Sequence, residues 1–455
     1  YMEELNQELW KLGILAKTEH NEVAPSQHEL ACIYRVANIA TDNNQLTMEV
    51  MQKVASRHGL VCLLHEKPFA GVNGSGKHNN WSLSTNTGMN LLEPGDTPFE
   101  NAQFLLFLTA VIEAVDEYQD LLRISVASAG NDHRLGANEA PPAIVSVYLG
   151  DELMNILEAI ENGSEYGGRE QELLRVGVHV LPKFPKDNTD RNRTSPFAFT
   201  GNKFEFRMLG SASSISDTNT VINTAVAEVL KKYADVLEAS DQFEGDLHEL
   251  IKESIKNHKR IIFNGNGYDE AWVEEARRRG LSNLRTTPDA LEHLLDKKNV
   301  DLFVSNKVFS EAELISRHEI MLENYCKVIG IEALTMIQMV RSSVLPASTE
   351  YRGRLAEAVR DISEVDNTAD VSYEKEQISR LSSLTGMAYR DVKALENALV
   401  SAKAAAGASD SAAEFRDQVI PAMNELRVVV DEMQTVTAKE YWPYPTYGEI
   451  LFSVR

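Results

Sequence analysis

Residues 71–85 read GVNGSGKHNNWSLST, a glycine-rich turn followed by an alternating polar strand. Glycine permits positive φ angles and lets a ligand approach the backbone, and the Asn73-Gly74 pair is typical of a tight turn. After the turn, alternation places an imidazole, an amide and hydroxyls on one strand face, from His78 to Ser84. This pattern fits a site for a polar or anionic ligand, with or without a metal. The alternative is a hairpin with a solvated polar face.

The overall composition is that of a soluble globular protein with more than one domain. The 455 residues are 43% hydrophobic and 25% charged, with a formal net charge of -23. This charge argues against non-specific binding to nucleic acid or to an anionic membrane. There is no apolar run long enough to span a bilayer and no signal-peptide pattern. Three scattered cysteines fit reduced thiols rather than a disulfide framework, so we expect a cytoplasmic protein.

Two glutamates flank a Pro-Ser break in EVAPSQHE, residues 22–29. Carboxylates separated by a turn can converge on a divalent cation, because hard cations take oxygen ligands. Glu22 and Glu29 are therefore candidate metal ligands. The alternative is a loop with solvated acids.

A later loop, SAGNDHRLGANEAPPAI at residues 127–143, holds Arg134 and Glu139. Its Gly, Asn and Pro content predicts irregular structure. One interpretation is that Arg134 binds a substrate carboxylate through two hydrogen bonds, while Glu139 is a mobile acid near the reacting groups. The other is a surface ion pair, which contributes little to stability.

The second strongly patterned stretch is DRNRTSPFAFTGNKFEFR, residues 190–207. Its end alternates strictly, with Lys203, Glu205 and Arg207 on one face and aromatic residues on the other. The aromatic face belongs in a core. The charged face is either a surface ladder or a cleft in which Glu binds a cation while Lys and Arg bind phosphate.

Long helical patterns dominate the chain after about residue 215 and contain few candidates for chemistry. We expect two domains: residues 1–240, with the polar stretches, and a mainly helical region at residues 241–455. The loop FNGNGY, residues 263–268, interrupts the helices.

The polar stretches together supply acids, a histidine, arginines and a lysine around a glycine turn. This is an inventory for phosphoryl transfer between anions, in which divalent metals bridge phosphates and arginines neutralise developing charge. The Walker A pattern and the protein-kinase motif set are absent from the sequence.

The segments EVAPSQHE, NGSGKHNNWSL, RLGANE, RNR and KFEFR occur in the order found in glutamine synthetases, and the chain most resembles the long type III form. The resemblance spans roughly residues 15–235 with specific motifs, and the rest of the chain resembles the helical C-terminal region of that form. It implies an α+β fold with a curved antiparallel sheet backed by helices, followed by a helical domain.

The resemblance also implies roles for individual residues. Metal ligands would be Glu22, Glu29, His78 and Glu205. Glutamate would be bound by Asn73, Gly74, Arg134 and Arg207. ATP would be bound by Tyr34, Ser82, Arg193 and Lys203. The catalytic residues would be Glu139, Arg193 and Arg207. Glu139 would lie on a flap over the site and accept a proton from ammonium.

The implied reaction is ATP-dependent ligation of ammonia to L-glutamate through γ-glutamyl phosphate, with Mg²⁺ or Mn²⁺. The implied assembly is a homo-oligomer of stacked hexameric rings. The family's β-grasp domain and an upstream pair of glutamates are missing from this sequence, so we expect a C-terminal portion that is inactive or nearly so alone. Two alternatives are a γ-glutamyl ligase for another amine and a non-catalytic glutamate- or nucleotide-binding assembly subunit.

Overall fold

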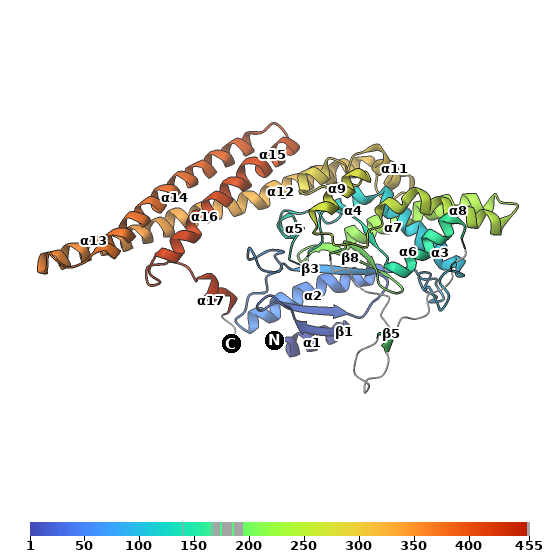
Figure 1. Cartoon of the computed structure of the whole chain (residues 1–455), viewed down its shortest axis with the longest axis horizontal. Coiled ribbons are helices and arrows are strands. Elements are labelled where there is room, and N and C mark those ends of the chain that lie inside the picture. The colour runs from blue at the N-terminus through green and yellow to red at the C-terminus, as the bar shows by residue number, and fades with distance from the viewer. Residues whose placement is uncertain (139, 165, 167–172, 175–183, 186–193, 453–455) are drawn as a thin grey trace. The chain divides into compact units, whose positions relative to one another are not determined.

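A computed structural model describes residues 1–452 except 139, 165, 167–172, 175–183 and 186–193. The chain forms two compact units, Tyr1–Leu314 and Ile315–Arg455 (Figure 1). The sequence-based boundary near residue 240 differs from this division. The reason is that α8 (Phe243–His258) packs against α3 (Ala102–Glu117) of the first unit.

The central sheet of the first unit has the strand order β3-β8-β7-β4. Its strands are β3 (Gly76–Trp81), β4 (Val147–Tyr148), β7 (Phe197–Phe199) and β8 (Phe204–Gly210). The pairs β3–β8 and β8–β7 are antiparallel, whereas β4 joins the edge in parallel with β7. The α+β class predicted from the sequence is confirmed, with a small sheet that is antiparallel except at this edge.

Aromatic side chains on β7 and β8 fill the space beneath the sheet, as the alternation of KFEFR predicts. Phe197 stacks on Phe204 with ring centroids 4.8 Å apart, and Phe199 meets Phe204 edge-on at 5.3 Å. Such pairs contribute about 0.5–1.5 kcal/mol each beyond the burial of their area. All seven residues of β8 are buried, so its charged residues face a covered surface rather than open solvent.

Helices cover this sheet. Helix α3, whose side chains are mostly buried, packs against α7 (Ser216–Glu238) and α8, and α8 also packs on α6 (Asp151–Asn162). Side-chain hydrogen bonds fix α7 to β3, since Asn79 Nδ2 donates to Asn219 Oδ1 at 3.0 Å. The β3 edge of the sheet is therefore held in place from the helical side.

A second layer comes from the beginning of the chain. It contains α1 (Met2–Lys11), the antiparallel strands β1 (Ala16–Asn21) and β2 (His28–Cys32), and α2 (Ala37–Arg57). Leu5 and Leu9 of α1 pack with Ile14 and Val54 in a small core of their own. The turn between β1 and β2 carries the predicted EVAPSQHE motif, and Glu22 N donates to Gln27 O at 2.9 Å across it.

Shorter elements complete the first unit. They are α4 (Gln119–Ile124), α5 (Ala129–Arg134), β5 (Leu173–Leu174) paired with β6 (Phe184–Pro185), η1 (Lys259–Ile261), α9 (Glu270–Arg278), α10 (Thr287–Leu291) and α11 (Lys297–Ser305).

The second unit is helical. Its elements are α12 (Glu311–Met339), η2 (Val340–Val344), α13 (Leu345–Val365), α14 (Ser372–Ala404), α15 (Ala408–Glu414), η3 (Phe415–Val419), α16 (Ile420–Val436) and α17 (Tyr447–Leu451). Helix α14 packs on α13 and α16. Each π-helical turn, η2 and η3, is followed by a proline, Pro346 or Pro421, whose missing N–H disturbs the regular ladder.

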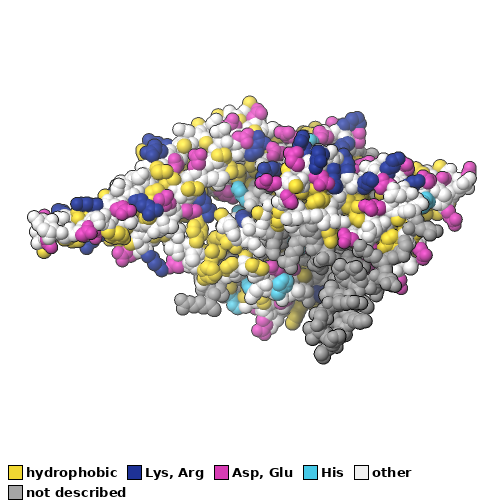
Figure 2. Space-filling model, in the orientation of Figure 1, with side chains coloured by type: hydrophobic (Ala, Val, Ile, Leu, Met, Phe, Trp, Pro, Cys, Tyr) yellow, Lys and Arg dark blue, Asp and Glu magenta, His cyan; other side chains and the backbone are white. Residues whose placement is uncertain are grey.

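Hydrophobic and charged side chains are interspersed on the face of the molecule that Figure 2 shows. Large exposed hydrophobic residues of the second unit include Val365, Val400 and Val428. The continuous helix Glu311–Val365 is long and apolar enough to cross a membrane by length and composition, which differs from the sequence-based expectation. These two criteria alone are weak evidence of a membrane span, because core helices of soluble proteins also meet them.

Candidate functional site

The pairing of β3 with β8 brings His78 and Glu205 together. His78 Nδ1 lies 2.8 Å from Glu205 Oε1, and the register of the two strands shifts between Lys77 and Asn79, at His78 itself. The His78 side chain is half exposed, whereas the Glu205 carboxylate is buried. An accessible imidazole therefore stands over a buried acid at the edge of the sheet.

Glu205 keeps its negative charge despite its burial. Burial raises the pKa of this carboxyl, but hydrogen bonds and charge from His78 and Arg207 outweigh it and lower the pKa to about 2. Arg207 Nη2 lies 3.2 Å from Glu205 Oε2 and is itself buried. The strand thus presents a preformed carboxylate with a fixed cation beside it.

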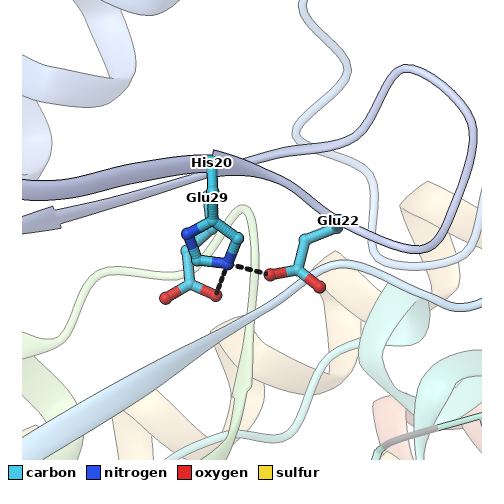
Figure 3. Close-up of side chains that lie close together, drawn as sticks. All are labelled: His20, Glu22 and Glu29. Carbon is cyan, nitrogen blue, oxygen red and sulfur yellow. Dashed lines mark ion pairs between the residues drawn. The ribbon is translucent and has the colours of Figure 1, made fainter.

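The β1–β2 turn forms a second cluster, of His20, Glu22 and Glu29 (Figure 3). His20 Nε2 lies 2.9 Å from Glu22 Oε1 and 3.8 Å from Glu29 Oε2. One ligand atom from each of the three residues falls within 4.8 Å of the others. The carboxylates that the sequence analysis singled out as metal ligands are therefore brought together.

Electrostatics connect the two clusters. Burial, and then a hydrogen bond and charge repulsion from Glu22, raise the pKa of Glu29, and the nearby His78 opposes this rise. Two carboxylates this close repel each other, so a divalent cation between them would relieve a real cost. Mixed carboxylate and imidazole donors fit such an ion. The predicted ligands form two pairs, Glu22 with Glu29 and His78 with Glu205, and the charge of His78 acts on Glu29.

His20 was missed by the sequence analysis. Cross-strand pairing places His20 opposite Glu29, and Glu22 follows directly after the end of β1, with its Oε1 2.9 Å from His20 Nε2. His20 precedes Glu22 by two residues in the sequence. That spacing has meaning only once His20 is known to lie on a strand that pairs with Glu29.

We expect His20→Ala to weaken Mn²⁺ binding about tenfold, the lower end of the effect of removing a group that orients metal ligands. Isothermal titration with Mn²⁺ measures this change. The matched control is His248→Ala, an exposed histidine on α8. Equal losses in both variants would contradict a specific role for His20.

The glycine turn lies against Arg134. A Cβ at Gly74 would come within 2.6 Å of Glu66 O and 3.1 Å of Arg134 Cγ, and a Cβ at Gly76 would collide with the Arg134 guanidinium. Only glycine leaves room for this approach. Gln27 Nε2 also donates to Gly74 O at 3.3 Å, which ties the turn to the β1–β2 loop.

Arg134 acts here as a buried brace. Its guanidinium donates to the backbone oxygens of Arg207 at 3.2 Å and Leu209 at 3.2 Å, and to Asn131 Oδ1 at 3.2 Å. Burial lowers the pKa of Arg134 to about 10, while the negative charge of Glu66 opposes the change. A direct contact of Arg134 with a substrate carboxylate stays a prediction.

The other predicted residues are distributed around these groups. Ser82 Oγ donates to Asn90 Oδ1 at 2.8 Å and to Asn202 O at 2.9 Å, next to Lys203. Asn73 and Lys203 are partly buried, whereas the Tyr34 side chain is 91% exposed. Glu139 and Arg193 lie outside the described residues.

Lys77 is a partly buried amine that the sequence analysis did not select. Its Nζ donates to Ser213 O at 2.7 Å and also to Ser211 O. Burial lowers the pKa of Lys77 to about 8, and Glu66 opposes the change. A lysine at this position joins β3 to the segment that follows β8.

Stability should therefore rise with pH above 8. Between pH 8 and about 10.5 the unfolded chain keeps the Lys77 proton that the folded chain has lost, so the free energy of unfolding increases with pH. Urea unfolding of wild type and Lys77→Met at pH 7.5, 8.5 and 9.5 measures this rise. The free energy of unfolding should increase with pH more in wild type than in the variant. If the free energies of unfolding of the two proteins changed with pH in the same way, the result would contradict this role of Lys77.

The fold and the site define a class of protein. It is an α+β protein in which carboxylate and imidazole side chains lie close together at the edge of the sheet, near a glycine-rich turn. A family model of the glutamine synthetase catalytic domain matches residues 1–145, and one of the glutamine synthetase C-terminal domain matches residues 246–363. The chain belongs to the glutamine synthetase family, which confirms the resemblance.

Relatives match the chain along its whole length. A glutamine synthetase of Butyrivibrio fibrisolvens is 48% identical over 100% of this chain and 65% of its own length. A type-3 glutamine synthetase of Dictyostelium discoideum is 46% identical over 99% of this chain and 62% of its own. The solved apo structure of GmaS matches 72% of this chain and 59% of its own at 17% identity and a TM-score of 0.46. The chain thus spans slightly less than two thirds of these two glutamine synthetases.

Proposed function

We propose that this chain takes part in the ATP-dependent ligation of ammonia to L-glutamate, which gives glutamine through γ-glutamyl phosphate. The observation that carries the proposal is the meeting of His78 with Glu205 next to Glu22 and Glu29. Membership of the glutamine synthetase family supports it.

In this proposal Glu22 and Glu29 hold a divalent cation near the substrate glutamate, and His78 and Glu205 hold one near the ATP phosphates. A divalent cation held by these residues, Mg²⁺ or Mn²⁺, would supply positive charge that offsets the charge of the phosphoryl groups. Glu205 suits this role because its carboxyl is already ionised at neutral pH.

The remaining groups bind and orient the anions. Arg207 is buried and fixed by Glu205, so its charge would lie ready for the γ-carboxylate as it becomes an acyl phosphate. Lys203 and Ser82 would lie along the nucleotide. Preorganised charge of this kind lowers a barrier because no reorganisation is needed during the reaction.

Family membership also motivates a proposal for the cellular context. The protein would act in the cytoplasm as a homo-oligomer of stacked hexameric rings, a dodecamer, with ATP, glutamate and ammonia as its small-molecule partners. Sedimentation velocity of the purified protein would test the ring assembly.

The direct test is glutamine formation from glutamate, ATP and ammonium with Mg²⁺ or Mn²⁺, followed by chromatography of the product. Glutamine that depends on both ATP and the metal would support the proposal, and robust formation by these 455 residues alone would overturn the expectation that this portion is inactive or nearly so by itself. Methylamine and ethylamine in place of ammonium test the alternative of a γ-glutamyl ligase for a larger amine. Metal-dependent ATP binding without any amide product would favour a non-catalytic subunit.

A further inference from the structure

A buried carboxylate, Glu66, lies directly beneath the glycine turn. Glu66 stands between α2 and β3 and is 4% exposed. Glycines face both of its oxygens: a Cβ at Gly130 would collide with Oε2, and a Cβ at Gly210 would collide with Oε1. Two separate segments, α5 and the end of β8, therefore leave space for this one side chain.

Hydrogen bonds connect Glu66 to the turn and to the end of β8. Ser75 N donates to the Glu66 backbone oxygen at 2.8 Å, so the turn is fixed to the Glu66 main chain. Ala212 N donates to Glu66 Oε1 at 3.0 Å, so the side chain holds the segment that follows β8. One residue thus joins the turn to the strand that carries Glu205 and Arg207.

The charge of Glu66 acts on two nearby cations, buried Arg134 and partly buried Lys77. Both Lys77 and Arg134 interact electrostatically with Glu66, which favours their charged forms against the effect of burial. Arg134 in turn fills the space beside Gly74 and Gly76. A buried charge without a partner is costly, so loss of Glu66 should alter the position of Arg134 before that of more distant groups.

We propose that Glu66 is a positioning residue for the glutamate pocket: it balances Arg134 and Lys77 and holds the turn at residues 73–76 in register with the end of β8. This inference rests on the proposed function, in which Asn73, Gly74 and Arg134 contact glutamate. Glu66 itself lies beneath the pocket and touches no substrate.

The test is Glu66→Gln, which keeps the shape of the side chain and removes its charge. The KM for glutamate should rise about tenfold or more, because Arg134 loses the nearby negative charge that favours its ionised form and the segment after β8 loses a charged acceptor. The KM for ATP should change by less than about twofold, because Ser82 and Lys203 flank the opposite end of the β3–β8 pair from Gly210, against which Glu66 lies. Glu49→Gln, an exposed carboxylate on α2, is the matched control.

A double variant separates positioning from folding. Glu66→Gln leaves Arg134 and Lys77 without the nearby negative charge, and adding Lys77→Met removes one of these two cations, so the double variant should recover melting temperature lost by the single variant. Its KM for glutamate should stay raised, because Arg134 still lacks its partner. A wild-type KM in the double variant, or equal changes in the KM values for glutamate and ATP, would overturn the proposal.

Hydrogen exchange gives a readout that does not depend on activity. The Ala212 amide, which donates to Glu66 Oε1, should exchange about tenfold faster in Glu66→Gln than in wild type, and the amides of α14 should be unaffected. Unchanged exchange at Ala212 overturns the assignment of Glu66. Absence of glutamine formation by the wild-type protein contradicts the proposed function instead, and the exchange result then decides the role of Glu66 alone.

Discussion

Glu205→Gln should lower metal-dependent glutamine formation by about 100-fold or more. The substitution removes a buried, ionised ligand that His78 contacts at 2.8 Å, and it leaves Arg207 beside a neutral amide. Loss of groups outside the ligand shell already costs about 10–100-fold, so loss of a ligand should cost at least as much. The effect should be largest on kcat, because the charges concerned stabilise phosphoryl transfer rather than substrate encounter.

Binding measurements distinguish this loss from unfolding. In wild type, ATP affinity should increase when Mg²⁺ or Mn²⁺ is added, and in Glu205→Gln this dependence should largely disappear while the far-UV spectrum is retained. Glu396→Gln, in an exposed pair with Arg341 of the second unit, is the control. Retention of full activity by Glu205→Gln would refute the metal site, and equal losses in the control would show that the effect is not local.

The strand alternation around Glu205 made half of the site predictable. KFEFR and NGSGKHNN each indicate which side chains share a face, and antiparallel pairing of two polar faces brings His78 to Glu205. Alternation does not show, however, whether other parts of the protein cover the polar face of a strand. Both faces of β8 are buried, and elements distant along the chain such as β3 and α5 contact it, which local patterns in the sequence do not reveal.

The missed residues are those whose role depends on tertiary contacts. His20, Glu66 and Lys77 each occur in an ordinary sequence context, and each acquires its partners from segments distant along the chain. The difference in domain boundary has the same origin. Helical periodicity after residue 240 shows that α8 is a helix, but only packing shows that it belongs with α3.

The second large effect concerns stability. We expect Arg123→Met to lower the free energy of unfolding by about 3–5 kcal/mol, the cost of leaving one partner of a buried ion pair alone. Arg123 is fully buried, and its Nη2 lies 2.8 Å from Asp132 Oδ1. Its Nε also donates to Leu284 O at 2.8 Å, so the pair fixes α4, α5 and the segment before α10 to one another.

The pH dependence of this variant tests the mechanism. Burial raises the pKa of Asp132, and Arg123 opposes the rise, so without Arg123 the carboxyl should take up a proton more readily in the folded chain. A group whose folded pKa is raised stabilises the fold at low pH and loses this contribution as pH increases. The deficit of Arg123→Met should therefore be smaller at pH 4 than at pH 7 in urea unfolding, and Asp132→Asn added to it should recover part of the loss at pH 7. Arg277→Met, which breaks an exposed pair with Glu274, should cost less than about 1 kcal/mol. A deficit that is independent of pH and unaffected by Asp132→Asn would mean that Arg123 contributes packing and backbone hydrogen bonds rather than charge.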